Sequence, residues 1–325
     1  MTAPTLPSPK GGGRLEVGIG LQGNRAPEAY AKLAKLAEEY GFDVLTVFSD
    51  LMYQPAIAPL MAAALNTRRI RLGPACLNPF TLHPVEIAGQ IAALDLASNG
   101  RAYLGLARGA WLEKIGVRPA RPVTALREAA EIVRVLLARN PGGYRGDIFS
   151  VAPDTTLKFD VQRSRVPLLI GTWSAKTAAL AGEIADEVKI GGTANPAMVQ
   201  RMRGFIDAGT ARASRSSEDV GIVVGAVTVV AEDGAAARHL ARSAVAMYLD
   251  IVRRLDPTTE RPDGGPISDE VLDRFAMAGT PEQVAAQARA LFEAGARRVE
   301  FGSPHGLTAD EGIRLLGERV LPQLR

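Results

Sequence analysis

Asp50 is the first residue of this 325-residue chain whose type and place suggest chemistry, because it follows the short apolar run 43–48. A lone carboxylate at the end of a buried segment can exchange a proton or hydrogen-bond a ligand. Aspartate is equally common as the residue that caps the amino end of a helix. The sequence leaves both interpretations of Asp50 open.

Residues 108–113, Arg-Gly-Ala-Trp-Leu-Glu, place a cation, an aromatic ring and an acid together after another apolar run. Trp111 can line an apolar substrate pocket, and Glu113 can act as an acid or base. The alternative is an exposed ion pair between Arg108 and Glu113 beside a packed tryptophan.

Two glycine-rich turns, Gly171-Thr172-Trp173-Ser174 and Gly191-Gly192-Thr193, follow later apolar runs. Small residues before a helix let backbone N–H groups approach a ligand, and a helix amino terminus attracts phosphate. Ser174 stands where a helix cap is expected. The alternative is that both segments are ordinary turns between a strand and a helix.

Cysteine and histidine chemistry is poorly supported, since the chain has one cysteine and three histidines. Cys76 has no histidine near it and reads as an inert, packed thiol. His83 precedes Pro84 and is expected where a helix begins, whereas His305 is a candidate to reach a substrate. No metal site or catalytic triad is predicted, which favours chemistry supplied by a bound cofactor.

The composition bounds the class of protein. The net charge is +3, 47% of residues are hydrophobic, and only 5% are aromatic. Dispersed charge with few aromatic residues argues against nucleic-acid binding, and no apolar run reaches the length of a membrane span. We therefore expect a cytoplasmic globular protein that binds a small molecule, with a flexible tail over residues 1–14 and one domain over 15–325.

Eight short apolar runs alternate with amphipathic segments, which predicts parallel strands separated by helices. The expected strands are 15–22, 43–48, 69–76, 101–107, 166–171, 186–192, 221–231 and 297–303. The expected helices are 27–40, 55–66, 84–97, 121–139, 174–183, 195–210, 233–254, 281–294 and 309–317. Thr280, Pro281 and Gln283 form a capping box where one of these helices begins.

This alternation predicts an α/β fold, a (β/α)8 TIM barrel with a hairpin insertion at 140–160, after the fourth helix, and a loop insertion at 256–270, before the helix at 281–294. An open doubly wound sheet is the alternative, but the first strand lacks a complete G-x-G-x-x-G turn. In a TIM barrel, ligands bind at the carboxyl ends of the strands, where all the candidate residues above stand.

Residues 69–109 resemble the bacterial-luciferase-like superfamily, and most closely its branch that uses coenzyme F420, which includes methylenetetrahydromethanopterin reductase. The matching residues are Gly73, Asn78, Pro79, His83 and Pro84, followed by Ala93-Leu94-Asp95 and Gly100-Arg101. Segments 181–192 and 278–287 are further matching pieces, so the resemblance covers about residues 15–320.

The resemblance implies site residues position by position. It implies a cis peptide bond at Ala75–Cys76 behind the cofactor ring, with Asp50 and Asn78 beside the ring. It also implies that F420, or FMN as the alternative, binds Arg108, Gly109, Gly171, Thr172, Ser174, Gly191 and Gly192. Leu51 and Ala110 depart from the family, which has histidine and, in members acting on sugar phosphates, glutamate there. Ala110 therefore disfavours a sugar-phosphate substrate.

The activity implied by this resemblance is hydride transfer between the deazaflavin ring and a small organic substrate. An FMN-dependent monooxygenase and a non-catalytic flavin-binding barrel are the alternatives. The family also implies a homodimer.

Overall fold

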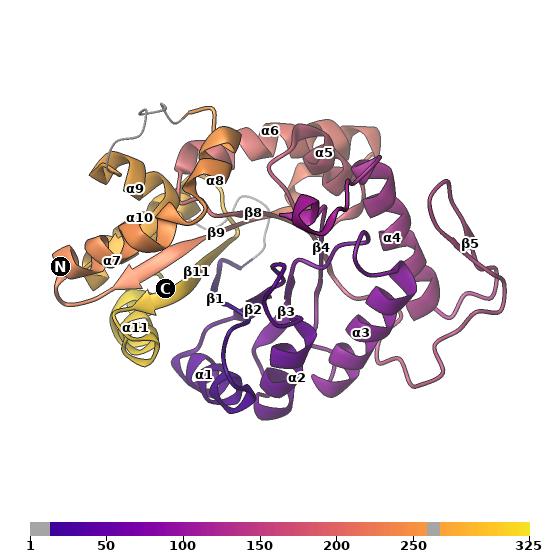
Figure 1. Cartoon of the computed structure of the whole chain (residues 1–325), viewed down its shortest axis with the longest axis horizontal. Helices are drawn as coiled ribbons and strands as arrows, with labels where there is room; N and C mark the ends of the chain where they lie inside the picture. The colour runs from indigo at the N-terminus through magenta and orange to yellow at the C-terminus, as the bar shows by residue number, and fades with distance from the viewer. Residues whose placement is uncertain (1–13, 259–266) are drawn as a thin grey trace.

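The computed structural model describes residues 14–258 and 267–325. The predicted tail before Arg14 and residues 259–266 of the predicted loop lie outside the described residues. Strands line the middle of the molecule and helices surround them (Figure 1). The eight strands of the barrel are β1 (Glu16–Leu21), β2 (Val44–Phe48), β3 (Arg71–Ala75), β4 (Leu104–Ala107), β7 (Leu168–Gly171), β8 (Glu187–Gly191), β9 (Gly221–Val230) and β11 (Arg298–Gly306).

All eight strands run parallel, in the order β3-β2-β1-β11-β9-β8-β7-β4. Two isolated parallel bridges, Leu72 with Ala102 and Leu77 with Leu106, join β3 to the β4 side. The ends of the strand order therefore meet, and the predicted TIM barrel is confirmed.

Helices follow the strands, and each except α7 begins and ends within a few residues of the expected position. They are α1 (Pro27–Tyr40), α2 (Ile57–Asn66), α3 (Pro84–Ala97), α4 (Pro122–Leu137), α5 (Ala175–Ile184), α6 (Pro196–Arg212), α7 (Gly234–Ala246), α10 (Pro281–Glu293) and α11 (Ala309–Leu315). His83 caps α3 through Nδ1, which accepts the Val85 N–H at 3.3 Å, as expected of its place before Pro84.

The single helix expected over 233–254 is wrong. It breaks at Tyr248 into α7 and α8 (Leu249–Leu255), because Tyr248 leaves helical geometry with φ −128° and ψ −2°. The loop expected over 256–270 is also too long at its carboxyl end, because helix α9 (Asp269–Phe275) begins within it. That helix leads into β10 (Ala276–Gly279), a short strand that pairs with β9 and was not expected.

The predicted hairpin insertion is present as β5 (Tyr144–Arg145) and β6 (Ser150–Val151), an antiparallel pair. Buried Glu128 of α4 accepts the backbone N–H groups of residues 147–149 at 2.8 to 2.9 Å. The ring of Phe149 packs edge-on against His83, with the centroids 5.6 Å apart. These contacts fasten the insertion to α3 and α4.

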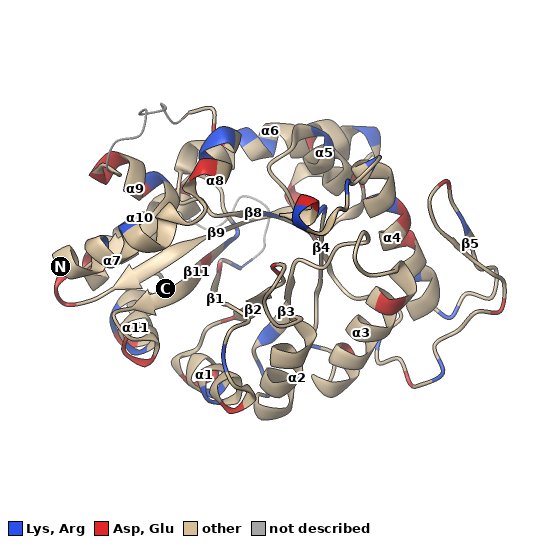
Figure 2. Ribbon diagram, viewed as in Figure 1, with Lys and Arg blue, Asp and Glu red and all other residues tan. Residues whose placement is uncertain are grey.

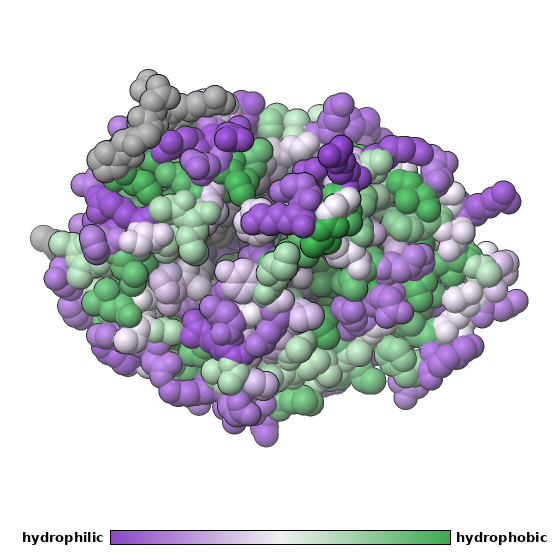
Figure 3. Space-filling view, viewed as in Figure 1, coloured by the Kyte–Doolittle hydropathy of each residue, from purple (hydrophilic) through white to green (hydrophobic). Residues whose placement is uncertain are grey.

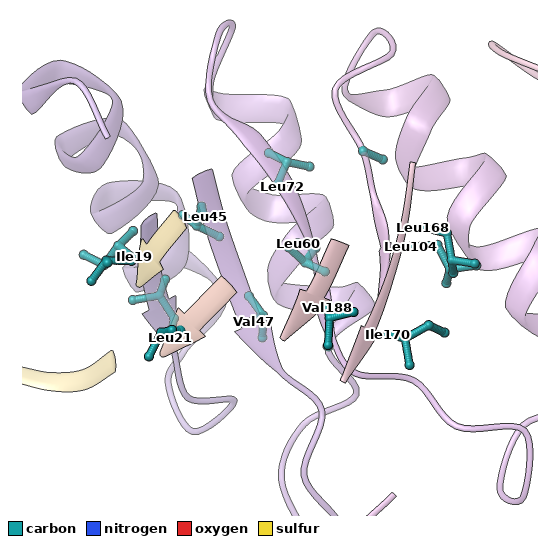
Figure 4. Close-up of a cluster of buried hydrophobic side chains, with 14 of the residues drawn as sticks. Ile19, Leu21, Leu45, Val47, Leu60, Leu72, Leu104, Leu168, Ile170 and Val188 are labelled. Atoms are coloured by element: carbon teal, nitrogen blue, oxygen red, sulfur yellow. The ribbon is translucent and has the colours of Figure 1, made fainter. Parts of the chain in front are cut away.

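Apolar side chains from the strands and the facing helices form the main core, including Ile19, Leu45, Leu72, Leu104 and Ile170 (Figure 4). Charged residues of both signs are dispersed over the helices (Figure 2). Hydrophilic and hydrophobic surface is intermixed on the face shown in Figure 3, which is hollowed near its middle. Within the described residues, no helix is long and apolar enough to span a membrane.

Candidate active site at the carboxyl ends of the strands

Asp50 lies just beyond β2, half-buried, and Gln22 beyond β1 donates to its Oδ2 from Nε2 at 3.3 Å. The residue that caps α2 is Ala56, not Asp50, so the helix-cap interpretation is excluded. Burial raises the pKa of Asp50, while the Gln22 hydrogen bond and the positive charge of Lys189 oppose that rise. The carboxyl group therefore stands at the mouth with one oxygen held and the other without a hydrogen bond to the described residues.

The end of β3 carries the cis peptide bond between Ala75 and Cys76 that the resemblance implied. The Ser49 N–H donates to the Ala75 carbonyl at 3.1 Å, which ties this turn to the β2 end. A Cβ on Gly171 would stand 2.8 Å from the Cys76 sulfur, so the ends of β3 and β7 are in close contact. Burial raises the pKa of the Cys76 thiol to about 12, and a protonated thiol agrees with an inert, packed cysteine.

Asn78 organises the next loop. Its Oδ1 accepts the N–H groups of Phe80 and Thr81 at 3.1 and 3.0 Å. Its amide nitrogen lies 3.1 Å from where a Cβ of Gly109 would stand, and Gly109 has φ +85°. Glycine at 109 thus allows the β4 loop to pass close to Asn78.

The 108–113 segment forms a loop in which Leu112 is buried and Trp111 is half-buried. Trp111 adopts a left-handed conformation, φ 55°. Glu113 lies exposed on the turn η1 (Leu112–Ile115). Among the described residues, no hydrogen bond or ion pair joins Arg108 to Glu113, so the surface-pair alternative finds no support. Nor does any such contact bring Glu113 to Asp50, and the predicted acid–base role of Glu113 stays a prediction.

The two glycine-rich turns are joined by Trp173, whose Nε1 donates to the Gly191 carbonyl at 3.0 Å. The Thr172 N–H donates to the Lys189 carbonyl at 2.9 Å, which brings the β7 end beside β8. A Cβ on Gly191 would meet no atom within 4 Å, so open space faces this residue. Gly192 has φ +78° and packs under Val252 of α8.

Ser174 precedes α5, but its side chain does not cap the helix. Thr172 Oγ1 instead accepts the Ser174 N–H at 2.9 Å. The first-turn N–H groups of α5 therefore have no side-chain acceptor from Ser174, although they are the groups that bind anions.

His305 lies within β11, which extends three residues past the expected strand, and its side chain is fully buried. Its Nε2 donates to the Gly20 carbonyl at 3.0 Å. Burial lowers its pKa to about 4, against the opposing effect of that hydrogen bond. The expected contact with a substrate at the mouth is not supported, because β11 continues and holds the ring inside the barrel wall.

A charged pair that the sequence analysis did not single out, Lys189 of β8 and Glu300 of β11, lies inside the barrel. A signal was available, since each residue is a charge between two apolar neighbours inside a predicted strand, Val188-Lys189-Ile190 and Val299-Glu300-Phe301. Trp173 was likewise quoted only as part of its turn.

The strand order defines a TIM barrel, and polar groups gather at the carboxyl ends of its strands, where ligands bind in proteins of this fold. Residues 12–298 match the luciferase-like monooxygenase family, and the chain belongs to that family. The resemblance found in the sequence is thereby confirmed.

The chain is similar to several enzymes over most of its length. The chain is 31% identical to 5,10-methylenetetrahydromethanopterin reductase of Archaeoglobus fulgidus, over 90% of this chain and 94% of that protein. It is 27% identical to the F420-dependent glucose-6-phosphate dehydrogenase of Microbacterium testaceum, over 92% and 95% respectively. The structure of the coenzyme F420-dependent tetrahydromethanopterin reductase from Methanopyrus kandleri superposes with a TM-score of 0.82 at 25% identity, covering 96% of this chain and all of that one.

Proposed function

We propose that this protein is an F420-dependent oxidoreductase that transfers a hydride between the deazaflavin ring and a small organic substrate. The single observation that carries the proposal is the glycine-rich rim beside the uncapped amino end of α5. The F420-dependent relatives support the choice of cofactor.

The described residues fit a phosphate-bearing cofactor. The first turn of α5 is not capped by Ser174, and Gly191 faces open space. Trp173 holds these two segments together through its hydrogen bond to Gly191. Helix N–H groups and a glycine that permits close approach together suit a phosphate group. Asn78 and the Ala75–Cys76 turn, at the end of β3, form the wall expected to lie behind the ring.

Bound F420 would supply the ring carbon that gives or accepts the hydride. The protein residues orient the cofactor, exclude water and handle protons. Asp50 is the proposed proton-exchanging group, because burial raises its pKa and its Oδ2 accepts a hydrogen bond from Gln22. Trp111 is the proposed substrate wall.

F420 is preferred over FMN because its polyglutamate tail needs cations beside the phosphate site. Lys176, in the first turn of α5, and Arg108 are both exposed, and neither is in a salt bridge or side-chain hydrogen bond with another described residue. These two cations are available to an anionic tail, which FMN lacks.

Fluorescence titrations of the purified protein with F420 and with FMN test the proposal. We expect F420 to bind more tightly, and we expect Lys176→Gln and Arg108→Gln to weaken F420 binding more than FMN binding. Lys35→Gln on α1, an exposed lysine outside the rim, is the matched control. Binding of neither cofactor would refute the proposal, and tighter binding of FMN would favour a monooxygenase.

A non-catalytic barrel is the remaining alternative. Stable F420 binding without turnover across a panel of carbonyl, alcohol and imine substrates would support it. A homodimer and a cytoplasmic location stay predictions.

A further inference from the structure

Arg25, in the loop that follows the carboxyl end of β1, carries a charge that no described residue balances. Its side chain is half-buried, and its Nε is buried without a hydrogen-bond partner. No hydrogen bond or ion pair joins its guanidinium group to any other residue within 14–258 and 267–325. Taking a charged donor out of water without a partner costs free energy, so this arrangement suits a partner that arrives with a ligand.

Hydrogen bonds hold the loop that carries Arg25 in place. The hydroxyl of buried Tyr30 donates to the Gln22 carbonyl at 3.1 Å and accepts the Arg25 N–H at 2.9 Å. Gln54, in the loop after β2, donates from Nε2 to the Arg25 carbonyl at 2.8 Å. A Cβ on Gly23 would stand 2.9 Å from the Gln54 carbonyl oxygen, so the two loops are in contact. The backbone of Arg25 is therefore fixed while its guanidinium group has no partner, and a group fixed in advance binds a ligand at lower entropic cost.

The β1 loop lies on the Asp50 side of the mouth and across from the proposed phosphate site. Gln22, which hydrogen-bonds Asp50, belongs to the same loop as Arg25. Burial lowers the pKa of His305 on β11 to about 4, and the positive charge of Arg25 acts in the same direction. In the closed order of the eight strands, β1 and β7 are four places apart. The turn between β7 and α5 therefore stands on the opposite side of the barrel, and an anion at Arg25 is distinct from the phosphate proposed at α5.

An arginine without a counterion at a ligand site favours one kind of partner. The planar guanidinium group donates two parallel hydrogen bonds to a carboxylate or phosphate group, and such charge-assisted bonds are stronger than neutral ones. Lys176 and Arg108, the cations proposed for the cofactor tail, follow β7 and β4 and not β1. The anion that Arg25 suits is thus neither the phosphate nor the tail of the proposed cofactor.

We propose that Arg25 binds a carboxylate or phosphate group of the substrate, so that the substrate is an organic anion held beside the β1 loop. The proposal rests on the proposed function and adds the class of substrate to it. Arg25 fixes the charged end of the substrate, which leaves the reacting carbon to face the cofactor ring near Asp50.

The first experiment is an NMR titration of the Arg25 Nε–H resonance in the purified protein, assigned by its loss in Arg25→Gln. The probes are acetate and inorganic phosphate at constant ionic strength, and their relative affinities distinguish a carboxylate from a phosphate site. We expect at least one probe to shift the resonance with saturation. The matched control is the Nε–H of Arg68, an exposed arginine between α2 and β3 at the amino ends of the strands, which should not saturate.

The second experiment compares keto acids with neutral ketones of the same size as substrates. Arg25→Gln should raise the KM of the keto acids by on the order of tenfold, the effect of losing one hydrogen-bonded charge. It should change kcat less and leave the KM of the neutral ketones unchanged. Arg25→Lys keeps the charge without the planar fork and should lose less, and Arg68→Gln should change none of these quantities.

A saturable shift at Arg25 without one at Arg68 supports the proposal. Absence of saturation at Arg25, equal shifts at both arginines, or an equal effect of Arg25→Gln on keto acids and ketones overturns it. Weaker F420 binding in Arg25→Gln would assign Arg25 to the cofactor and would also overturn it. If no member of the panel is turned over, the titration alone decides. A protein that saturates at Arg25 but binds no F420 refutes the proposed function, while the anion site at Arg25 stands.

Discussion

The two ends of the barrel differ in how their charged groups are paired. At the amino ends of the strands, Arg71 and Arg298 lie among Glu16 and Glu187, with ion-pair distances from 2.8 to 3.7 Å. At the carboxyl ends, Asp50 keeps one oxygen without a hydrogen bond to the described residues, and α5 begins without a side-chain cap. We call the amino ends of the strands the closed end, because their charges form ion pairs with one another. We call the carboxyl ends the open end, because Asp50 and α5 leave polar groups there without such partners among the described residues.

This difference distinguishes charged groups that stabilise the fold from charged groups that are proposed to bind a ligand. Arg298 is fully buried, and although burial lowers its pKa, the charges of Glu187 and Glu300 outweigh that effect and raise it. Glu300 is the counterpart: burial raises its pKa, but Lys189 and Arg298 hold it below its usual value. Charges at the closed end are thus stabilised by each other, whereas Asp50 is not fully compensated.

Removing a charge from the ion pairs at the closed end should cause the largest loss in the free energy of unfolding. Arg298→Met leaves the nearby glutamates buried without their shared cation, and we expect a loss of about 3–5 kcal/mol in the free energy of unfolding. Arg319→Met is the control, because Arg319 pairs with Glu232 and Glu282 on the exposed surface and should cost about 1 kcal/mol or less. Urea denaturation of both variants measures these losses, and equal losses would show that the buried ion pairs contribute no more to stability than the exposed ones.

His305 lies near the carboxyl end of β11 but is fully buried in the barrel wall, so a fall in pH should lower the stability of the fold. Its pKa falls from 6.5 to about 4 on folding, so the unfolded chain binds a proton between those values when the folded one does not. Its stabilising contribution is complete above pH 6.5 and is lost as the pH falls through 4, by on the order of 3 kcal/mol.

Melting temperatures between pH 7 and pH 4 compare the wild type with His305→Gln, which cannot ionise. The wild type should lose stability more steeply over this range. Parallel curves would show that the ring is accessible to protons in the folded state and would revive its predicted place beside the substrate.

Filling the open end should weaken binding without unfolding the protein. Gly191→Val adds a side chain into space where no protein atom lies within 4 Å, so stability should hold while F420 affinity falls about tenfold, or about 1.4 kcal/mol. Gly204→Val on α6 also meets open space but lies outside the rim, and it should change neither quantity. Unchanged F420 affinity in Gly191→Val would place the phosphate elsewhere.

The same contrast explains what the sequence could predict. Apolar runs predicted the eight strands, because strands buried on both faces need apolar residues. Glycine and proline at the ends of helices predicted where the helices begin and end. The resemblance located the Ala75–Cys76 bond and the Asp50 position. The break at Tyr248 and strand β10 were not predicted. They depend on contacts between residues distant in sequence, such as the hydrogen bond from the Tyr248 hydroxyl to the Phe275 carbonyl. The Lys189–Glu300 pair was not predicted either, because the two residues come together only when β8 and β11 take their places in the barrel.

Ser174 and Thr280 offer the smallest and most direct test of the contrast. Both precede helices, but only Thr280 makes a capping box, in which it accepts the Gln283 N–H and Gln283 returns the bond. Thr280→Ala should therefore cost about 1 kcal/mol of unfolding free energy. Ser174→Ala should cost about none, because its side chain satisfies no helix N–H group.

The binding measurement completes that comparison. If the uncapped first turn of α5 receives the cofactor phosphate, Ser174→Ala weakens F420 binding at most by the loss of one hydroxyl contact, and Thr280→Ala leaves it unchanged. A loss of stability in Ser174→Ala as large as in Thr280→Ala would mean that the serine caps α5 after all. The N–H groups of that first turn would then be occupied in the free protein, and the main support for a phosphate there would be gone.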